Sequence, residues 1–359
     1  MKSAPASRIP SLDGLRAISI LLVIGGHLWW RVPGASGVPV VFAGLGVHVF
    51  FVLSGYLITR LLQEEQERAG QISLVAFYRR RCFRIFPAAF TYILIIALLS
   101  PSSRSALLYA ATYTVSYHVD AMPVLFAHLW SLSVEEQFYL LWPLALLLGF
   151  RRRAGVAWSA MFLAAAFRLA LALSPSHFSA AYLHYSFPGT MDSIAAGCLL
   201  AIYWPQVRKR CAWMAESPAI PIAVAVTAWT LDVALWGDTS STAVRSLSML
   251  WGAVPLLIAL LVFLLIERRD WIFNNPVASA IGVLSYSLYL WQQAFTLENQ
   301  HSALASLLML AGCAVASYLL IEKPMLKLGA SIKSRKPIRE HLERATLSPV
   351  FQTEALTKK

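Results

Sequence analysis

The fold is decided by the stretch Leu15-Arg-Ala-Ile-Ser-Ile-Leu-Leu-Val-Ile-Gly-Gly-His-Leu-Trp-Trp30, the first long apolar run of the chain. It contains two ionisable side chains, Arg16 and His27, eleven residues apart. At about 100° per residue, this spacing puts both on one stripe of a helix, roughly 16 Å apart along its axis. Ionisable residues are costly at membrane depth and usually mark function there. The run therefore predicts a membrane-spanning helix that carries a functional pair.

The composition indicates an integral membrane protein. Of the 359 residues, 58% are hydrophobic and 13% are charged, and the mean hydropathy is +0.62. An ordinary soluble domain carries about 25% charged residues. The net charge of +12 would suggest nucleic acid as a partner in a soluble protein, but in a membrane protein basic residues set topology. We therefore expect the lipid bilayer, and no nucleic acid, as a partner.

Apolar stretches recur along the rest of the chain. A helix needs roughly 20 mainly apolar residues to cross a bilayer. The pattern predicts an all-α, polytopic membrane protein with about ten transmembrane helices. The predicted spans are residues 15–32, 42–62, 85–101, 138–150, 154–173, 190–204, 218–236, 247–266, 277–297 and 304–322.

The distribution of Lys and Arg orients these spans. With the N-terminus inside, 25 of the 30 basic residues fall in cytoplasmic segments, and only Arg31, Arg104 and Arg245 fall outside. This bias predicts that both termini are cytoplasmic. The count requires that residues 102–137 do not cross the membrane, so we interpret them as an outer loop that dips into the bilayer, where protein buries it.

The chain divides into two parts. Residues 1–330 are predicted to form one transmembrane domain, and the polar residues 331–359 a flexible cytoplasmic tail. No cleavable signal sequence is evident, so the first helix is expected to stay. Cys82 and Cys211 fall in basic inner loops, which face a reducing compartment, and the cysteine and histidine spacings predict neither a disulfide framework nor a metal site.

Polar residues gather in four further motifs, far apart in the chain. His48 and Ser54 in the second span are six residues apart, so they lie on different helix faces and need not act together. The motifs are Gly46-Val-His-Val-Phe-Phe-Val-Leu-Ser-Gly-Tyr-Leu-Ile58, Phe77-Tyr-Arg-Arg-Arg-Cys-Phe-Arg-Ile-Phe-Pro87 at the inner face, Leu129-Trp-Ser-Leu-Ser-Val-Glu-Glu-Gln-Phe-Tyr-Leu-Leu-Trp-Pro143 at the outer mouth of the fourth span, and Leu284-Ser-Tyr-Ser-Leu-Tyr-Leu-Trp-Gln-Gln293 in the ninth.

Together with Leu12-Asp-Gly-Leu-Arg-Ala and His27, these motifs resemble the membrane acyltransferase 3 family. That family includes O-acetyltransferases of lipopolysaccharide, exopolysaccharide and Nod factor, and macrolide acyltransferases. The resemblance keeps one order from Leu12 to about Pro324. It departs in the ninth span, where Gln292 stands at a position that often carries His in family members.

The resemblance implies transfer of an acyl group, usually acetyl from acetyl-CoA, to a hydroxyl of a carbohydrate or glycosidic acceptor at the cell inner membrane. An alcohol is a poor nucleophile near neutral pH, and histidine is the side chain best suited to act as its base. We therefore predict His27 as the general base. Glu136, or its neighbour Glu135, is the candidate carboxylate that would hold the imidazole tautomer. A transient acyl-enzyme on His27 remains an alternative to direct transfer.

A donor site is predicted on the cytoplasmic side. Guanidinium groups bind phosphate through paired hydrogen bonds. We expect Arg16, which we also count among the catalytic residues, to hold the charged end of acyl-CoA together with Arg80, Arg81 and Arg84. The roughly 16 Å from Arg16 to His27 is comparable with an extended pantetheine arm.

Each of these residues also has a structural interpretation. The run Arg79 to Arg84 can serve as a topology anchor, Arg16 can snorkel or pair with Asp13 at i, i+3, and His27 can be a buried histidine bonded to another helix. Glu135 and Glu136 can cap the fourth helix, the tryptophans can form an interfacial belt, and His48, Asp192 and Arg168 favour structural pairing. Alternative functions are a transporter or flippase of a lipid-linked sugar and a sensor without catalysis, although no two halves with matching broken helices are evident.

Overall fold

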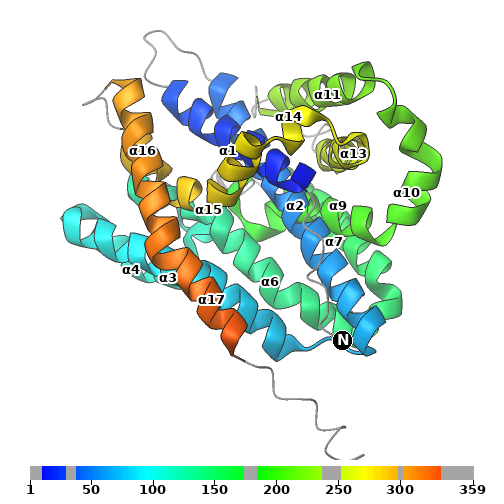
Figure 1. The fold of residues 1–359 in the computed structure, drawn as a ribbon, viewed down its shortest axis with the longest axis horizontal. Coiled ribbons are helices and arrows are strands. Elements are labelled where there is room, and N and C mark those ends of the chain that lie inside the picture. Colours follow the sequence, from blue (N-terminus) through cyan, green and yellow to red (C-terminus); the bar gives the residue numbers. More distant parts are fainter. Residues whose placement is uncertain (1–9, 30–37, 174–183, 237–251, 298–301, 333–359) are drawn as a thin grey trace, which may run out of the picture.

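The computed structural model describes residues 10–29, 38–173, 184–236, 252–297 and 302–332, and every element within them is helical (Figure 1). The predicted tail beyond residue 332, Arg31 and Arg245 lie outside these residues. The main helices are α1 (Pro10–Trp29), α2 (Val38–Ala69), α3 (Leu74–Leu99), α4 (Leu107–Ala111), α5 (Val124–Ala127), α6 (Leu129–Gly149), α7 (Arg153–Leu173), α9 (Phe187–Ile202), α10 (Trp204–Cys211), α11 (Ala219–Trp236), α13 (Ala253–Arg268), α14 (Trp271–Asn274), α15 (Pro276–Thr296), α16 (Ala303–Ser317) and α17 (Lys323–Ser331).

All ten apolar stretches predicted from the sequence overlap a helix of the structure. Fewer of these helices are long and apolar enough to cross a membrane by themselves. Within the described residues they number five, or up to six if one pair bent by 108° forms a single broken span. The five are Ser11–Trp29, Phe42–Ala69, Leu74–Leu99, Phe150–Leu171 and Ala303–Ser331, and the bent pair is Trp204–Ala215 with Ala219–Val233.

Helix α3 begins earlier than the sequence predicted. Ser73 caps its first turn, because its hydroxyl accepts a hydrogen bond from the backbone N–H of Ala76 at 3.3 Å. The basic run from Phe77 to Pro87 is therefore helical, and its prediction as an inner loop was wrong. Arginine is a good helix former, and the positive-inside rule locates charge rather than a helix end. As a consequence, Arg81 and Arg84 share one helix face.

Helix α6 also begins before its predicted span. It includes Glu135 and Glu136 beyond its first turn, so these residues do not cap it. The preceding chain forms only short helical turns, the longest being the six residues of Pro101–Ala106. Such turns are too short to cross a bilayer, which needs roughly 20 residues. This supports the prediction of a non-crossing segment but ends it at Ala127 rather than at residue 137.

Helices α1 and α2 lie in the middle of the bundle, with α15 packed against α1 and α9 packed against α2. Glycines let the backbones touch at these crossings. A Cβ atom on Gly55 of α2 would collide with the carbonyl oxygen of Ile194 in α9, and one on Gly197 would collide with that of Val52. Small residues are the usual means of close helix approach in membranes. The helices that carry the polar motifs are thus fixed by backbone contact.

A methyl group at the α2–α9 crossing is expected to be costly. Gly55→Ala should lower the free energy of unfolding in detergent by about 1–3 kcal/mol, because the added atom must push two helices apart. Gly155→Ala is the matched control, since nothing lies within 4 Å of a Cβ at Gly155 in α7. There alanine should be neutral or slightly stabilising, as the better helix former. Equal responses of the two variants would contradict the contact argument.

A buried ion pair joins α7 to α9. Arg168 Nη2 lies 2.7 Å from Asp192 Oδ2, and each residue is only 2% exposed. Arg168 also donates to the carbonyl oxygen of Gly189 at 2.6 Å. One residue further along α9, Ser193 Oγ lies 2.8 Å from Nδ1 of His48 in α2. The predicted structural pairing of Arg168, Asp192 and His48 is confirmed.

Candidate active site

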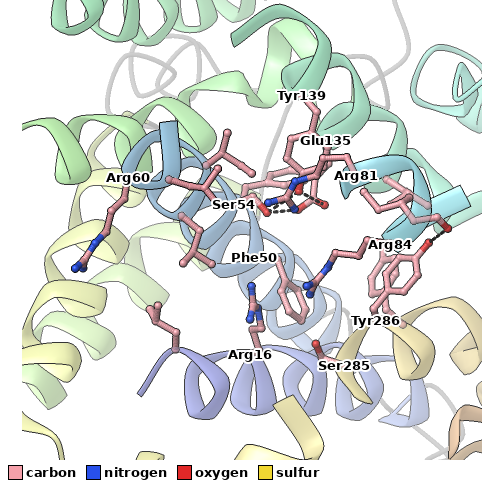
Figure 2. Close-up of a pocket in the computed structure, with 18 of the residues that line it drawn as sticks. Arg16, Phe50, Ser54, Arg60, Arg81, Arg84, Glu135, Tyr139, Ser285 and Tyr286 are labelled. Carbon is pink, nitrogen blue, oxygen red and sulfur yellow. Dashed lines mark hydrogen bonds between the residues drawn. The ribbon is translucent and has the colours of Figure 1, made fainter. Parts of the chain in front are cut away.

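A cavity of about 580 Å³ lies between α1, α2, α3, α6 and α15 (Figure 2). Each of the five sequence motifs contributes to its wall, although they are scattered over the whole chain. The polar residues that line it are Asp13 and Arg16 from α1, Ser54, Arg60, Glu64 and Arg68 from α2, Arg81 and Arg84 from α3, Ser131, Glu135 and Tyr139 from α6, and Ser285, Tyr286 and Tyr289 from α15.

The cavity is positively charged, because five arginines face three carboxylates. Arg16 lies 3.4 Å from Asp13 at i, i+3, as the sequence allowed. Arg60 and Arg68 both pair with Glu64, at 3.0 and 3.5 Å.

Arg81 and Arg84 form no ion pair within the described part of the chain. Arg84 of α3 and Arg16 of α1 point into the same space from two sides in Figure 2. Arg81 instead stacks on the ring of Tyr139, with its guanidinium carbon 5.1 Å from the ring centroid. These guanidinium groups are therefore available to an anionic ligand.

Arg80 differs from its neighbours. It is exposed, does not line the cavity, and donates to Glu65 Oε2 at 3.1 Å. Residue 80 is about 100° away from residue 81 around the helix, so the two cannot face the same space. Of the four arginines predicted to hold the donor, the structure brings Arg16, Arg81 and Arg84 together and turns Arg80 away.

Glu135 belongs to a hydrogen-bonded group at the wall. Ser54 Oγ donates to its Oε1 at 2.7 Å, and the Tyr139 hydroxyl donates to its Oε2 at 3.2 Å. Glu136 does not line the cavity, and its buried Oε1 has no hydrogen-bond partner. The structure therefore places the two predicted carboxylates on different sides of α6.

His27 is half-buried near the other end of α1 and does not line the cavity. Its Nδ1 lies 2.7 Å from the carbonyl oxygen of Val23. A carbonyl oxygen only accepts, so Nδ1 carries the hydrogen in the neutral ring and Nε2 keeps a lone pair. This backbone carbonyl, rather than Glu135 or Glu136, fixes the tautomer.

Two residues of the cavity wall, Ser131 and Tyr289, are hydrogen-bonded to each other and to His128. Ser131 Oγ and the Tyr289 hydroxyl lie 2.6 Å apart, and Tyr289 donates to the carbonyl oxygen of His128 at 2.8 Å. The His128 ring is buried between Gln293 Oε1, at 2.8 Å from Nδ1, and the carbonyl oxygen of Leu290, at 3.0 Å from Nε2.

The sequence did not indicate several residues of this site. The sequence did not single out Arg60, Glu64 and Arg68. The predicted second span ended at residue 62, whereas α2 continues to Ala69. Tyr139 and Tyr289 lie in quoted motifs, but no local pattern shows that two tyrosines reach the cavity. Within the described residues, no group of three or more His, Cys, Asp or Glu side chains gathers that could hold a metal ion.

Comparison with known proteins identifies the family of this chain. A family model described as an acyltransferase domain matches residues 9–322, most of the chain. This chain belongs to the acyltransferase 3 family. The matched region is described as an acyltransferase domain, and its candidate membrane spans are consistent with a membrane protein.

Similar proteins include bacterial O-acetyltransferases. This chain is 29% identical to the O-acetyltransferase OatA of Staphylococcus aureus strain NCTC 8325. The alignment, 384 positions long with its gaps, covers 89% of this chain and 58% of OatA. The values for OatA of strain COL are the same. A further relative from strain COL carries the provisional name of an O-acetyltransferase. It is 27% identical to this chain over an alignment that covers 80% of this chain and 50% of the relative. The chain thus spans about half the length of these curated relatives, and no solved structure matches it significantly.

Proposed function

We propose that this acyltransferase moves an acyl group, usually acetyl, from acyl-CoA to a hydroxyl of a carbohydrate or glycosidic acceptor. The observation that carries the proposal is the arginine-lined cavity to which all five sequence motifs contribute. His27 lies on the same helix as Arg16 and keeps a lone pair on Nε2. The names of the relatives support transfer to oxygen. The distance along α1, roughly 16 Å between the levels of Arg16 and His27, suits a donor with a charged end and a long thin arm.

In this proposal the donor binds with its phosphates at Arg16, Arg81 and Arg84. The two arginines of α3 support this role because they form no ion pair in the described structure and need a counter-charge. Arg60 and Arg68 line the cavity further along α2. Glu135 anchors the wall by holding Ser54 and Tyr139, which in turn supports the stacked Arg81.

His27 acts as the general base in this proposal. The Val23 carbonyl supports it by leaving Nε2 free to take the proton of the acceptor hydroxyl. The described structure gives no reason to prefer an acyl-enzyme, so direct transfer is the simpler proposal.

We further propose that about ten helices cross the bacterial inner membrane, with both termini cytoplasmic. The overlap of every predicted span with a helix supports this count, and the 25 basic residues in alternate segments support the orientation. Helices too short to cross alone, such as α9 and α13, are then buried among the others. Residues 1–330 form the transmembrane domain, and residues 331–359 form a cytoplasmic tail.

The proposed function is tested by the release of free CoA. Purified protein in detergent is given acetyl-CoA with and without a panel of oligosaccharides, and thiol release is followed together with ester formation on the sugar by mass spectrometry. We expect acceptor-dependent CoA release and one new ester per thiol. Movement of a sugar across proteoliposomes without any ester would instead support the transporter.

The donor site is tested by arginine removal. Arg84→Ala, and likewise Arg81→Ala, should raise the KM for acetyl-CoA about tenfold or more, because a charge-assisted hydrogen bond contributes about 1.5–3 kcal/mol. Arg80→Ala is the matched control, since Arg80 lies on the same helix but pairs with Glu65 outside the cavity. Its KM should stay at the wild-type value. An equal rise for all three would show that α3 acts only through its overall charge.

A further inference from the structure

Gln292 of α15 is a buried amide for which the described residues offer no partner. The residue is fully buried, and neither its Nε2 nor its Oε1 has a hydrogen-bond partner in the part of the chain that the structure describes. Buried amides are almost always hydrogen-bonded, because an unpaired donor or acceptor loses its hydration without compensation. An amide with both ends unpaired therefore indicates a group that another molecule completes.

The neighbouring Gln293 shows what a structural glutamine looks like on the same helix. Its Oε1 accepts from the backbone N–H of His128 at 3.3 Å and lies 2.8 Å from Nδ1 of the same residue. Gln293 is also buried, yet its side chain ties α15 to the start of α6. The helix thus carries two adjacent glutamines, of which only one is used by the fold.

Gln292 lies on the same stripe of α15 as two residues of the cavity wall. Ser285, Tyr289 and Gln292 follow each other at four and three residues, so they share one helix face. The first two line the cavity. Gln292 continues their row by about one turn.

Helices α1 and α15 run in the same direction. Gly282 meets Asp13, and three residues further along each helix Ser285 and Arg16 line the same cavity. On this alignment Gln292 lies between the levels of Tyr289 and His27.

We propose that Gln292 is a catalytic residue that donates a hydrogen bond from Nε2 to the carbonyl oxygen of the donor thioester. This proposal rests on the proposed function and adds the group that stabilises the oxyanion. A side-chain amide is a suitable donor, because it is neutral and, being fully buried, has no water to give up when it bonds an oxyanion.

Acyl transfer in this site proceeds by addition of the acceptor to the thioester carbon and loss of the thiolate. The acceptor oxygen bonds to the thioester carbon while His27 Nε2 takes the hydroxyl proton, and the carbonyl π pair moves onto the oxygen that faces Gln292. The pair on that oxygen then re-forms the carbon–oxygen π bond while the carbon–sulfur bond breaks, and the thiolate leaves with the bonding pair. The proton held by His27 neutralises the thiolate, so an ester and free CoA are formed.

Gln292→Met and Gln293→Met form a matched pair for the test. Full-length protein in detergent is assayed for CoA release from acetyl-CoA, with the oligosaccharide that supports the fastest wild-type release, and its thermal unfolding is recorded. Gln292→Met should lower kcat by about 10²–10³-fold with little change in the KM for acetyl-CoA. Its melting temperature should equal or exceed that of the wild type, since no bond is lost. Gln293→Met should lower the melting temperature.

Two results would overturn the role of Gln292. One is a wild-type kcat for Gln292→Met, and the other is a loss of melting temperature as large as that of Gln293→Met, which would indicate a structural role. Parallel assays of His27→Ala distinguish a failure of the role of Gln292 from a failure of the proposed function. If His27→Ala is inactive and Gln292→Met is not impaired, only the role of Gln292 fails. If His27→Ala keeps wild-type turnover, or the wild type releases no CoA, the proposed function fails as well.

Discussion

His27→Ala is expected to lower the kcat of CoA release from acetyl-CoA by about 10²–10⁴-fold, the range that a positioned general base contributes. The physical reason is the tautomer, because Val23 holds the hydrogen on Nδ1 and leaves the Nε2 lone pair to the acceptor hydroxyl. The KM for acetyl-CoA should change little, since His27 does not line the arginine-rich cavity. Steady-state kinetics with the purified protein separate the two constants.

His48→Ala is the control for this experiment. It removes another half-buried histidine from a neighbouring helix, one whose Nδ1 lies 2.8 Å from Ser193 Oγ and which likewise does not line the cavity. We expect its kcat to stay within a few-fold of the wild type. Wild-type turnover in His27→Ala would rule out the general base, and an equal loss in both variants would point to a general effect on folding.

Asp192→Leu is expected to lower the free energy of unfolding by about 3–5 kcal/mol. The substitution leaves the Arg168 guanidinium buried without its carboxylate, and that charge then has to stay desolvated between α7 and α9. Chemical denaturation in detergent or the melting temperature would measure the loss. Because the pair lies away from the cavity, any fall in kcat should follow the folded fraction.

A double variant tests whether the stability lost in Asp192→Leu comes from the unpaired charge of Arg168. Arg168→Met with Asp192→Leu removes both charges, and buried ion pairs replaced by well-packed apolar residues are often neutral or stabilising. We expect most of the stability lost in Asp192→Leu to return. A double variant as unstable as the single one would mean that the pair is needed for its hydrogen bonds, such as the one from Arg168 to Gly189.

The sequence was sufficient for the helices and for much of the site. Apolar length alone placed every predicted span on a helix, because the cost of burying backbone in lipid leaves few alternatives. The cost of buried charge selected Arg16, and phosphate-binding chemistry selected Arg81 and Arg84, which the fold does bring to one cavity. These predictions succeeded because apolar length and side-chain chemistry can be judged within one segment, without its contacts to other segments.

The rest depended on contacts between distant segments. Arg80 and Arg81 look equivalent in the sequence, and only the true start of α3 shows that one faces Glu65 and the other the cavity. Similarly, Glu135 was expected to serve His27, but Ser54 and Tyr139 hold it instead. Such pairings depend on helix crossings set by glycines such as Gly55, whose close approach leaves no local signal.

The length of α2 has a further consequence. Its 32 residues extend over about 48 Å, whereas the hydrocarbon layer is about 30 Å thick. On the proposed topology, the end that carries Arg60, Glu64 and Arg68 emerges from the lipid on the cytoplasmic side and forms a wall of the cavity there. On the proposed function, the bulky nucleotide head never leaves the aqueous side, and spent CoA departs by the route of its arrival. Only the small acyl fragment then traverses the bilayer, so export of the modification needs no separate carrier.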